Sequence, residues 1–131
     1  AKLALVGLMN TLKLEGQKND IRVNAISPVA ATRMTESLMP PEMLEKLAPR
    51  HVTPGVVYLA SRDAPNGAIL TAGAGVFALA QIVETEGAYL GAAASAEAVR
   101  DHWTRIADPA GAQAYSAGHL QTQKFLSKSA D

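Results

Sequence analysis

Apolar residues at helical spacing open the chain. Leu5, Leu8, Met9 and Leu12 fall on one face of a 3.6-residue period, and Leu3 and Val6 widen this apolar stripe. An apolar stripe of this kind is typical of a helix that packs one side against a core. The pattern therefore predicts an amphipathic helix that runs from the first residues to about Lys18.

A continuous apolar run follows this helix. Residues 21 to 27, IRVNAIS, contain β-branched side chains and are bracketed by polar turns, which is typical of a strand buried on both faces of a parallel sheet. Pro28 cannot donate to a sheet ladder, so we expect it to end the strand. Ligands of open α/β sheets bind beyond the carboxyl ends of the strands. The loop from Pro28 to Met34 is therefore a candidate site, although spacing alone fits an ordinary connection equally well.

Later segments have clear starting signals. Pro41 predicts a short helix, and the Thr-Pro pair at residues 53 and 54 predicts another, capped by the threonine hydroxyl. Residues 68 to 72 indicate the last strand of the sheet, whereas residues 76 to 90 are ambiguous between extended chain and helix. A serine at residue 95 with an early acid predicts a further helix. The glycines at 73 and 75 lack the third glycine of a phosphate loop, so we expect them to allow close backbone contact.

Composition narrows the classes of function. Twelve basic and twelve acidic residues balance in the 131-residue chain, without a long run of either sign, which argues against nucleic acid or a membrane surface as partner. Cysteine is absent, which excludes disulfides and thiolate chemistry and fits a reducing compartment, so we expect a cytoplasmic protein. No apolar run approaches the roughly 20 residues of a membrane span. We expect no metal site.

Several segments together resemble the carboxyl-terminal half of the short-chain dehydrogenase/reductases. The resemblance begins at Ala1-Lys2 and continues through the helix with Asn10 and Glu15. It includes DIRVNAISP at residues 20 to 28 and TRMT at residues 32 to 35, then LAPRHVTP at 47 to 54 and GAILTAGAG at 67 to 75. The branch that it resembles contains 3-hydroxyacyl-CoA dehydrogenases.

The resemblance implies an α/β fold, the second half of a Rossmann-type doubly wound parallel sheet with an appended helical extension. We expect parallel strands at residues 21 to 27 and 68 to 72, in a reductase segment that spans residues 1 to 91. Residues 92 to 131 would form the helical extension of the same domain. Because a parallel half-sheet needs cover on both faces, we expect either a homo-oligomer or a partner segment with the amino-terminal half of the fold.

The resemblance also assigns roles to residues at both ends of the first strand region. Lys2 matches the lysine of a Tyr-x-x-x-Lys motif, one helical turn after a tyrosine that would precede Ala1. In the family this lysine lowers the pKa of the tyrosine and holds the nicotinamide ribose, so that the tyrosine acts as general acid or base. On spacing alone, Lys2 would be a solvated lysine. The stretch that passes the nicotinamide in the family corresponds to Pro28, Val29, Ala30 and Thr32, and Val29 replaces the usual glycine.

Residues 35 to 50 correspond to the mobile flap that covers the substrate in the family. Methionine adapts to irregular apolar space, so apolar side chains here are candidates for an acyl pocket. These side chains are Met34, Leu38, Met39 and Met43. Simple packing of the same residues onto the sheet is the competing interpretation.

The sequence therefore predicts part of an NAD(P)-dependent oxidoreductase. Its substrate would be a secondary alcohol or ketone, in particular a 3-hydroxyacyl thioester, and its cofactor NAD or NADP. The alternative is a non-catalytic chain that only packs or dimerises. The glycine-rich phosphate loop, the catalytic serine and the tyrosine all lie upstream in the family. We therefore expect the 131-residue chain to be inactive by itself.

Overall fold

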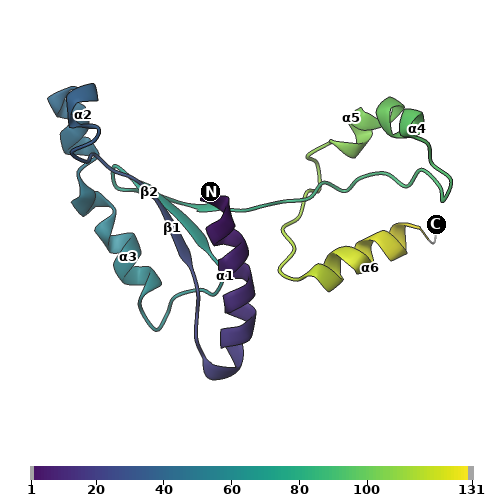
Figure 1. The fold of residues 1–131 in the computed structure, drawn as a ribbon, viewed down its shortest axis with the longest axis horizontal. Coiled ribbons are helices and arrows are strands. Elements are labelled where there is room, and N and C mark those ends of the chain that lie inside the picture. Colours follow the sequence, from purple (N-terminus) through teal and green to yellow (C-terminus); the bar gives the residue numbers. More distant parts are fainter. Residues whose placement is uncertain (1, 130–131) are drawn as a thin grey trace. The chain divides into compact units, whose positions relative to one another are not determined.

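A three-stranded mixed sheet organises the first part of the chain in the computed structural model, which describes residues 2–129 (Figure 1). Strand β1 (Ala25–Val29) pairs with β2 (Ile69–Gly73) in parallel, and β2 pairs with β3 (Val76–Ala80) in antiparallel orientation. The α/β class predicted from the sequence is confirmed. The two predicted strands pair in parallel as expected, but the expectation that residues 68 to 72 form the last strand is wrong, because a hairpin adds β3.

A two-residue turn makes this hairpin. Ala74 and Gly75 both have positive φ, 51° and 78°. Positive φ at both central residues is the mark of a type I′ turn, whose twist matches that of the two strands it joins. Gly73 allows the close backbone contact expected from the sequence, because a Cβ there would lie 2.9 Å from the carbonyl oxygen of Val29.

Strand β1 is shifted along the sequence relative to the prediction. It begins at Ala25 rather than at residue 21, because residues 22 to 24 bond instead to the loop that precedes β2. It also continues through Pro28, which pairs in register with Ala72. Within residues 2–129, β1 has β2 as its only neighbour, and proline is tolerated in such an edge strand. The expectation that Pro28 ends the strand is therefore wrong by one residue.

Helices flank the sheet. Helix α1 (Leu3–Gly16) and helix α3 (Thr53–Leu59) lie on opposite sides of β1 and β2 (Figure 1). Helix α3 packs closely, since a Cβ at Gly55 would lie 2.9 Å from side-chain carbons of Leu70 and Phe77. The first unit also contains helix α2 (Pro41–Lys46) and the short 3₁₀ helices η1 (Gln17–Asn19), η2 (Glu36–Leu38) and η3 (Pro49–His51).

The start of α1 and α2 agrees with the sequence, but the cap of α3 does not. Helix α2 begins at Pro41 as expected. At α3 the N-cap is Val52, and the Thr53 hydroxyl donates to the Pro49 carbonyl at 3.4 Å instead of capping the helix. The threonine is already inside the helix, where its hydroxyl reaches back along the chain.

The buried core of the described residues is small. Its apolar members are Met9, Val52, Ala64 and Ala72. In contrast, α1 exposes leucines at positions 3, 5, 8, 12 and 14. Met9 is thus the buried residue of α1 and Val6 is half-buried, whereas the leucines of the helix remain exposed within residues 2–129.

The chain divides between Gln81 and Ile82 into two units. The second unit contains α4 (Ala96–Asp101), α5 (Trp103–Ile106) and α6 (Gly118–Lys128), and an antiparallel bridge joins Glu84 to Gln113. The Ser95 cap is confirmed, since its hydroxyl accepts from the Ala98 amide at 3.2 Å. The division precedes the boundary expected at residues 91 and 92, and a helical extension of the reductase domain stays a prediction. Among the described helices, none combines the length and the apolar character that crossing a membrane requires.

Candidate active site

The loop that leaves the carboxyl end of β1 carries the nicotinamide-contacting residues expected from the sequence. Pro28 and Val29 are the last residues of β1, and Ala30 and Thr32 follow directly. Because β1 and β2 are parallel, both strands end at the same edge of the sheet. A hydrogen bond from the Ala31 amide to the Leu47 carbonyl, 2.7 Å long, ties this loop to the end of α2. The structure therefore holds the stretch at the edge where ligands of such sheets bind.

Thr32 is fixed by its backbone and free at its side chain. Its amide donates to the Thr35 hydroxyl at 2.9 Å, and its carbonyl accepts the amides of Thr35 and Glu36 at 2.8 and 3.0 Å. The Thr32 hydroxyl is exposed and makes no hydrogen bond within residues 2–129. A fixed backbone with a free hydroxyl is what a ligand-binding threonine requires.

A small cavity adjoins this threonine. Its volume is about 220 Å³, and its walls come from the β1–α2 connection and from α2 itself. The residues that line it are Ala31, Thr32, Arg33, Glu36 and Leu44. It offers a threonine hydroxyl, one cation and one carboxylate beside apolar carbon, so it suits a polar planar group better than an acyl chain.

Lys2 lies at the same end of the first unit. It is the exposed residue directly before α1, and α1 begins toward the end of the unit at which β1 finishes (Figure 1). Within residues 2–129, no hydrogen bond or ion pair connects the Lys2 ammonium to the loop from Pro28 to Thr32. The fold brings the two to one end of the sheet without direct contact between them.

Three of the four candidates for the acyl pocket are exposed, and the fourth is half-buried. Met34 and Leu38 are 87% and 77% exposed, Met43 is 48% exposed and Met39 is half-buried. None of them lines the cavity beside Thr32. Their role in binding substrate stays a prediction.

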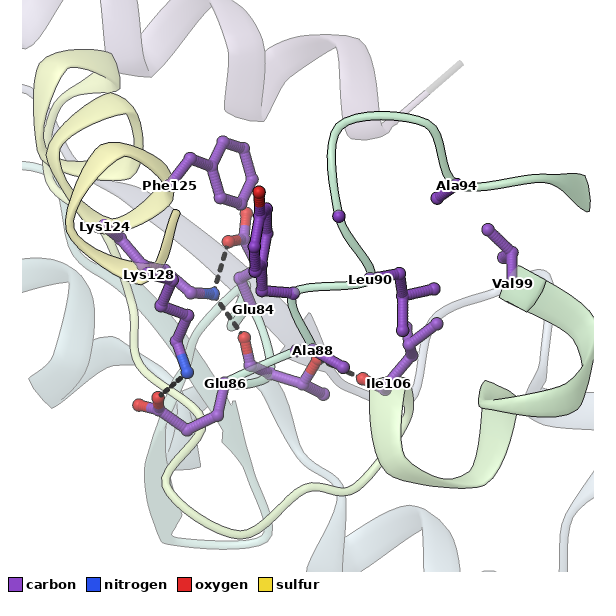
Figure 2. Close-up of a pocket in the computed structure, with 14 residues that line it drawn as sticks. Glu84, Glu86, Ala88, Leu90, Ala94, Val99, Ile106, Lys124, Phe125 and Lys128 are labelled. Carbon is purple, nitrogen blue, oxygen red and sulfur yellow. Dashed lines mark hydrogen bonds and ion pairs between the residues drawn. The ribbon is translucent and has the colours of Figure 1, made fainter. Parts of the chain in front are cut away.

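A second cavity, in the second unit, was not anticipated from the sequence. Its volume is about 520 Å³, and Figure 2 shows its walls. The extended segment from Glu84 to Gly91 forms one side, α4 and α5 contribute Val99 and Ile106, and α6 contributes Lys124, Phe125 and Lys128. Apolar side chains line much of it, and two ion pairs stand at one side.

These ion pairs join α6 to the extended segment. The Lys124 ammonium donates to Glu84 Oε1 at 2.7 Å and to the Thr85 carbonyl, and the Gln121 amide donates to the other Glu84 oxygen. Lys128 pairs with Glu86 Oε2 at 2.8 Å. The Lys124 side chain is only 10% exposed, so the Glu84 pair is the more enclosed of the two.

The ion pairs shift the pKa values of Glu84, Glu86 and Lys124. The hydrogen bond from Lys124 lowers the pKa of Glu84, and the hydrogen bond from Lys128 lowers that of Glu86. Burial by itself would lower the pKa of Lys124, but the bonded Glu84 carboxylate outweighs it, so the pKa lies above its ordinary value. Glu84, Glu86 and Lys124 are therefore charged at neutral pH.

A partial signal for this cluster exists in the sequence. Lys124 and Lys128 stand four residues apart, on one face of α6, and Glu84 and Glu86 stand two apart in extended chain. The two side chains of each pair project from the same side of their segment. No local pattern in the sequence, however, indicates that two segments about forty residues apart lie together. Sequence reasoning therefore missed it.

Sequence comparison finds known proteins that are similar to most of this chain. No protein-family model matches the chain. A short-chain type dehydrogenase/reductase of Mycobacterium tuberculosis is 44% identical over 114 residues, which cover 86% of this chain and 40% of that protein. By sequence, this chain is a relative of the short-chain dehydrogenase/reductases. The resemblance noted in the sequence is thereby confirmed.

Multifunctional enzymes are also similar to this chain. Peroxisomal multifunctional enzyme type 2 of mouse is 40% identical over 112 residues, 82% of this chain and 15% of the enzyme. The solved structure of full-length peroxisomal multifunctional enzyme type 2 from Drosophila melanogaster matches with a TM-score of 0.83 and 27% identity, over 97% of this chain and 24% of that one. The chain thus spans less than half the length of these relatives.

Proposed function

We propose that this chain supplies the nicotinamide-facing and substrate-facing half of an NAD(P)-dependent oxidoreductase. The reaction interconverts a secondary alcohol and a ketone, with a 3-hydroxyacyl thioester as the substrate. Two observations support the class of reaction: the relatives named dehydrogenase/reductase, and the fold shared with a multifunctional enzyme. The identities of the cofactor and of the substrate are proposed beyond these two observations.

The observation that carries the proposal is the Thr32 hydroxyl. It has a fixed backbone and no partner within residues 2–129, and it adjoins a cavity at the carboxyl edge of a parallel strand pair. A hydroxyl there can bond the carboxamide of a nicotinamide and set which ring face looks toward the substrate. Pro28 and Val29 would form one side of the nicotinamide site, and the restricted backbone of proline would keep that side fixed.

Lys2 would act through its charge. A bound nicotinamide would supply hydride transfer, from the carbinol carbon of an alcohol or to the carbonyl carbon of a ketone. The ammonium of Lys2 would hold the ribose and lower the pKa of a tyrosine one turn earlier on the same helix face. A tyrosine with a lowered pKa is a better general base toward the substrate hydroxyl at neutral pH.

The flap from Thr35 to Arg50 would receive the acyl part of the substrate. Met34, Leu38 and Met43 are exposed in the described structure and can therefore close on an apolar ligand. Met39, which is half-buried, would link the flap to the sheet. Thioether side chains suit acyl chains of varied length because they adapt their shape.

A non-catalytic packing role is the second candidate. The observation that favours it is the run of leucines that α1 exposes. In this case the same helix would serve only as a contact surface, and the loop after β1 would bind no nucleotide. The cytoplasmic location expected from the sequence also stays a prediction, since relatives such as the mouse enzyme are named peroxisomal.

The test joins the chain to the amino-terminal half of a short-chain reductase, which supplies the phosphate loop, the serine and the tyrosine. Oxidation of 3-hydroxyacyl thioesters is followed by the absorbance of reduced nicotinamide, with NAD and NADP in parallel. We expect turnover, and we expect Lys2→Ala to lower kcat/KM by about 100-fold or more, as loss of a general-base system does.

Thr32→Val tests the cofactor site separately. Loss of one hydrogen bond of about 1 kcal/mol should raise the KM for the dinucleotide by roughly fivefold. Thr53→Val, which removes a hydroxyl that bonds only the Pro49 carbonyl, is the matched control and should leave that KM unchanged. A fused protein that folds but does not turn over favours the packing role. Turnover by the isolated 131-residue chain would contradict the half-enzyme proposal.

A further inference from the structure

Two asparagines join the amino-terminal ends of β1 and β2. The Asn24 side chain donates to the Pro65 carbonyl at 2.6 Å and accepts the Ala68 amide at 2.9 Å. Asn66, in the loop before β2, makes two further hydrogen bonds. It accepts the Val23 amide at 2.9 Å and donates to the Lys13 carbonyl in α1 at 3.2 Å. We call Asn24 and Asn66 together the asparagine latch.

The second asparagine of the latch is followed by glycine. An asparagine-glycine step is chemically labile, because glycine has no side chain to shield its amide nitrogen from the neighbouring carboxamide carbon. Asn66 is exposed to water, and Gly67 has a φ of +83°. Thus a reactive sequence lies at a position where its side chain holds the fold.

We propose that Asn66–Gly67 is a deamidation site that the asparagine latch holds in check. Both polar atoms of the Asn66 side chain are bonded to other residues, and the Gly67 amide donates to the Val23 carbonyl at 2.9 Å. For reaction, the Gly67 nitrogen must turn away from Val23 and approach Cγ of Asn66. That approach breaks all three hydrogen bonds, so the reaction needs local opening of the latch.

The reaction consumes only water. The Gly67 nitrogen bonds to Cγ of Asn66 and loses its proton, and the side-chain nitrogen leaves as ammonia, which closes a succinimide ring. Water then opens either carbonyl of the ring and gives an aspartate or an isoaspartate at position 66. Nothing is oxidised or reduced, and one amide plus one water become one carboxylate and one ammonium ion.

The product cannot close the latch again. A carboxylate has no proton to donate to the Lys13 carbonyl, so the bond between the α3–β2 loop and α1 is lost. An isoaspartate also adds a backbone carbon between the loop and β2, directly before the Ala68 amide that bonds Asn24. Deamidation would therefore make a transient opening permanent.

The test measures deamidation by peptide mapping, in native buffer and in concentrated urea at the same mildly alkaline pH. Three hydrogen bonds of about 1 kcal/mol each predict that the native chain reacts at Asn66 about 100-fold more slowly than the unfolded chain. Asn10 and Asn19, which are followed by threonine and aspartate, are internal controls in every sample. In urea they should react far more slowly than Asn66.

A variant tests the latch itself. Asn24→Ala removes the bonds to Pro65 and Ala68 and should raise the native rate at Asn66 several-fold, whereas Asn10→Ala on exposed α1 surface should not. Should Asn24→Ala fail to fold, the native-to-urea ratio of the unsubstituted chain still decides the matter. Equal rates in native buffer and urea would overturn the proposal, as would a urea rate at Asn66 no higher than at Asn19.

Discussion

Lys124 joins α6 to two consecutive residues of the extended segment, Glu84 and Thr85. Its ammonium also lies 5.6 Å from the centroids of the Tyr115 and Phe125 rings, within the range of cation–π attraction. Lys124→Met keeps the apolar length of the side chain but leaves Glu84 without this partner. We expect faster amide hydrogen exchange in α6 and a lower midpoint of denaturation. Lys46→Met, at an exposed lysine of α2, should change neither.

The same cluster predicts a pH dependence. The pKa of Glu84 is lowered in the folded chain, mainly by the hydrogen bond from Lys124. The contribution of Glu84 to the free energy of unfolding is therefore complete above the ordinary glutamate pKa of about 4.3. It is lost as the pH falls through the lower pKa that Glu84 has in the folded chain. Hydrogen exchange of α6 should rise over that acid range. Glu84→Gln should flatten this rise, and an unchanged acid profile in the variant would show that Glu84 is not the responsible group.

At the scale of elements, the β2–β3 turn gives the clearest prediction. Gly75 has a φ of 78°, and a Cβ there would meet no atom within 4 Å, so an alanine would be strained by its backbone alone. We expect Gly75→Ala to lower the free energy of unfolding by about 1–2 kcal/mol. Gly7 in α1 also has open space, and Gly7→Ala should raise the free energy by up to about 1 kcal/mol through helix propensity. Urea unfolding followed by circular dichroism measures both, and equal signs would contradict the turn assignment.

Elements with a strong local signal could be predicted from the sequence, and those that depend on distant partners could not. The apolar pattern of α1 lies within one helix, and the proline at Pro41 and the serine cap at Ser95 act within one helical turn. The sequence left β3 ambiguous because its antiparallel pairing depends on positive φ values at both Ala74 and Gly75. An alanine in the sequence gives no sign that its φ is positive. The loop after β1 was found as a candidate site from the strand pattern, and the family resemblance supplied the roles of its residues. Its link to Leu47 and its cavity come only from the tertiary fold.

At the scale of the whole molecule, exposed apolar residues predict association. Leu3, Leu5 and Leu8 of α1 are 77%, 59% and 54% exposed, far more than a helix usually leaves open on its apolar face. The sheet also lacks a partner at one edge, because β1 is unpaired there within the described residues. As in the sequence-based prediction, we expect this cover to come either from a second copy or from a segment with the amino-terminal half of a reductase fold.

Sedimentation of the purified chain tests this prediction. We expect a species larger than the 13.7 kDa monomer at micromolar concentration, because apolar surface of this extent gains free energy when it leaves water. Leu5→Gln combined with Leu8→Gln should shift the distribution toward monomer if α1 forms the contact. Leu38→Gln, at a 77% exposed leucine outside α1, is the control and should leave the distribution unchanged. A monodisperse monomer that binds no apolar dye would mean that α1 needs no cover, and the case for a missing half of the sheet would then rest on β1 alone.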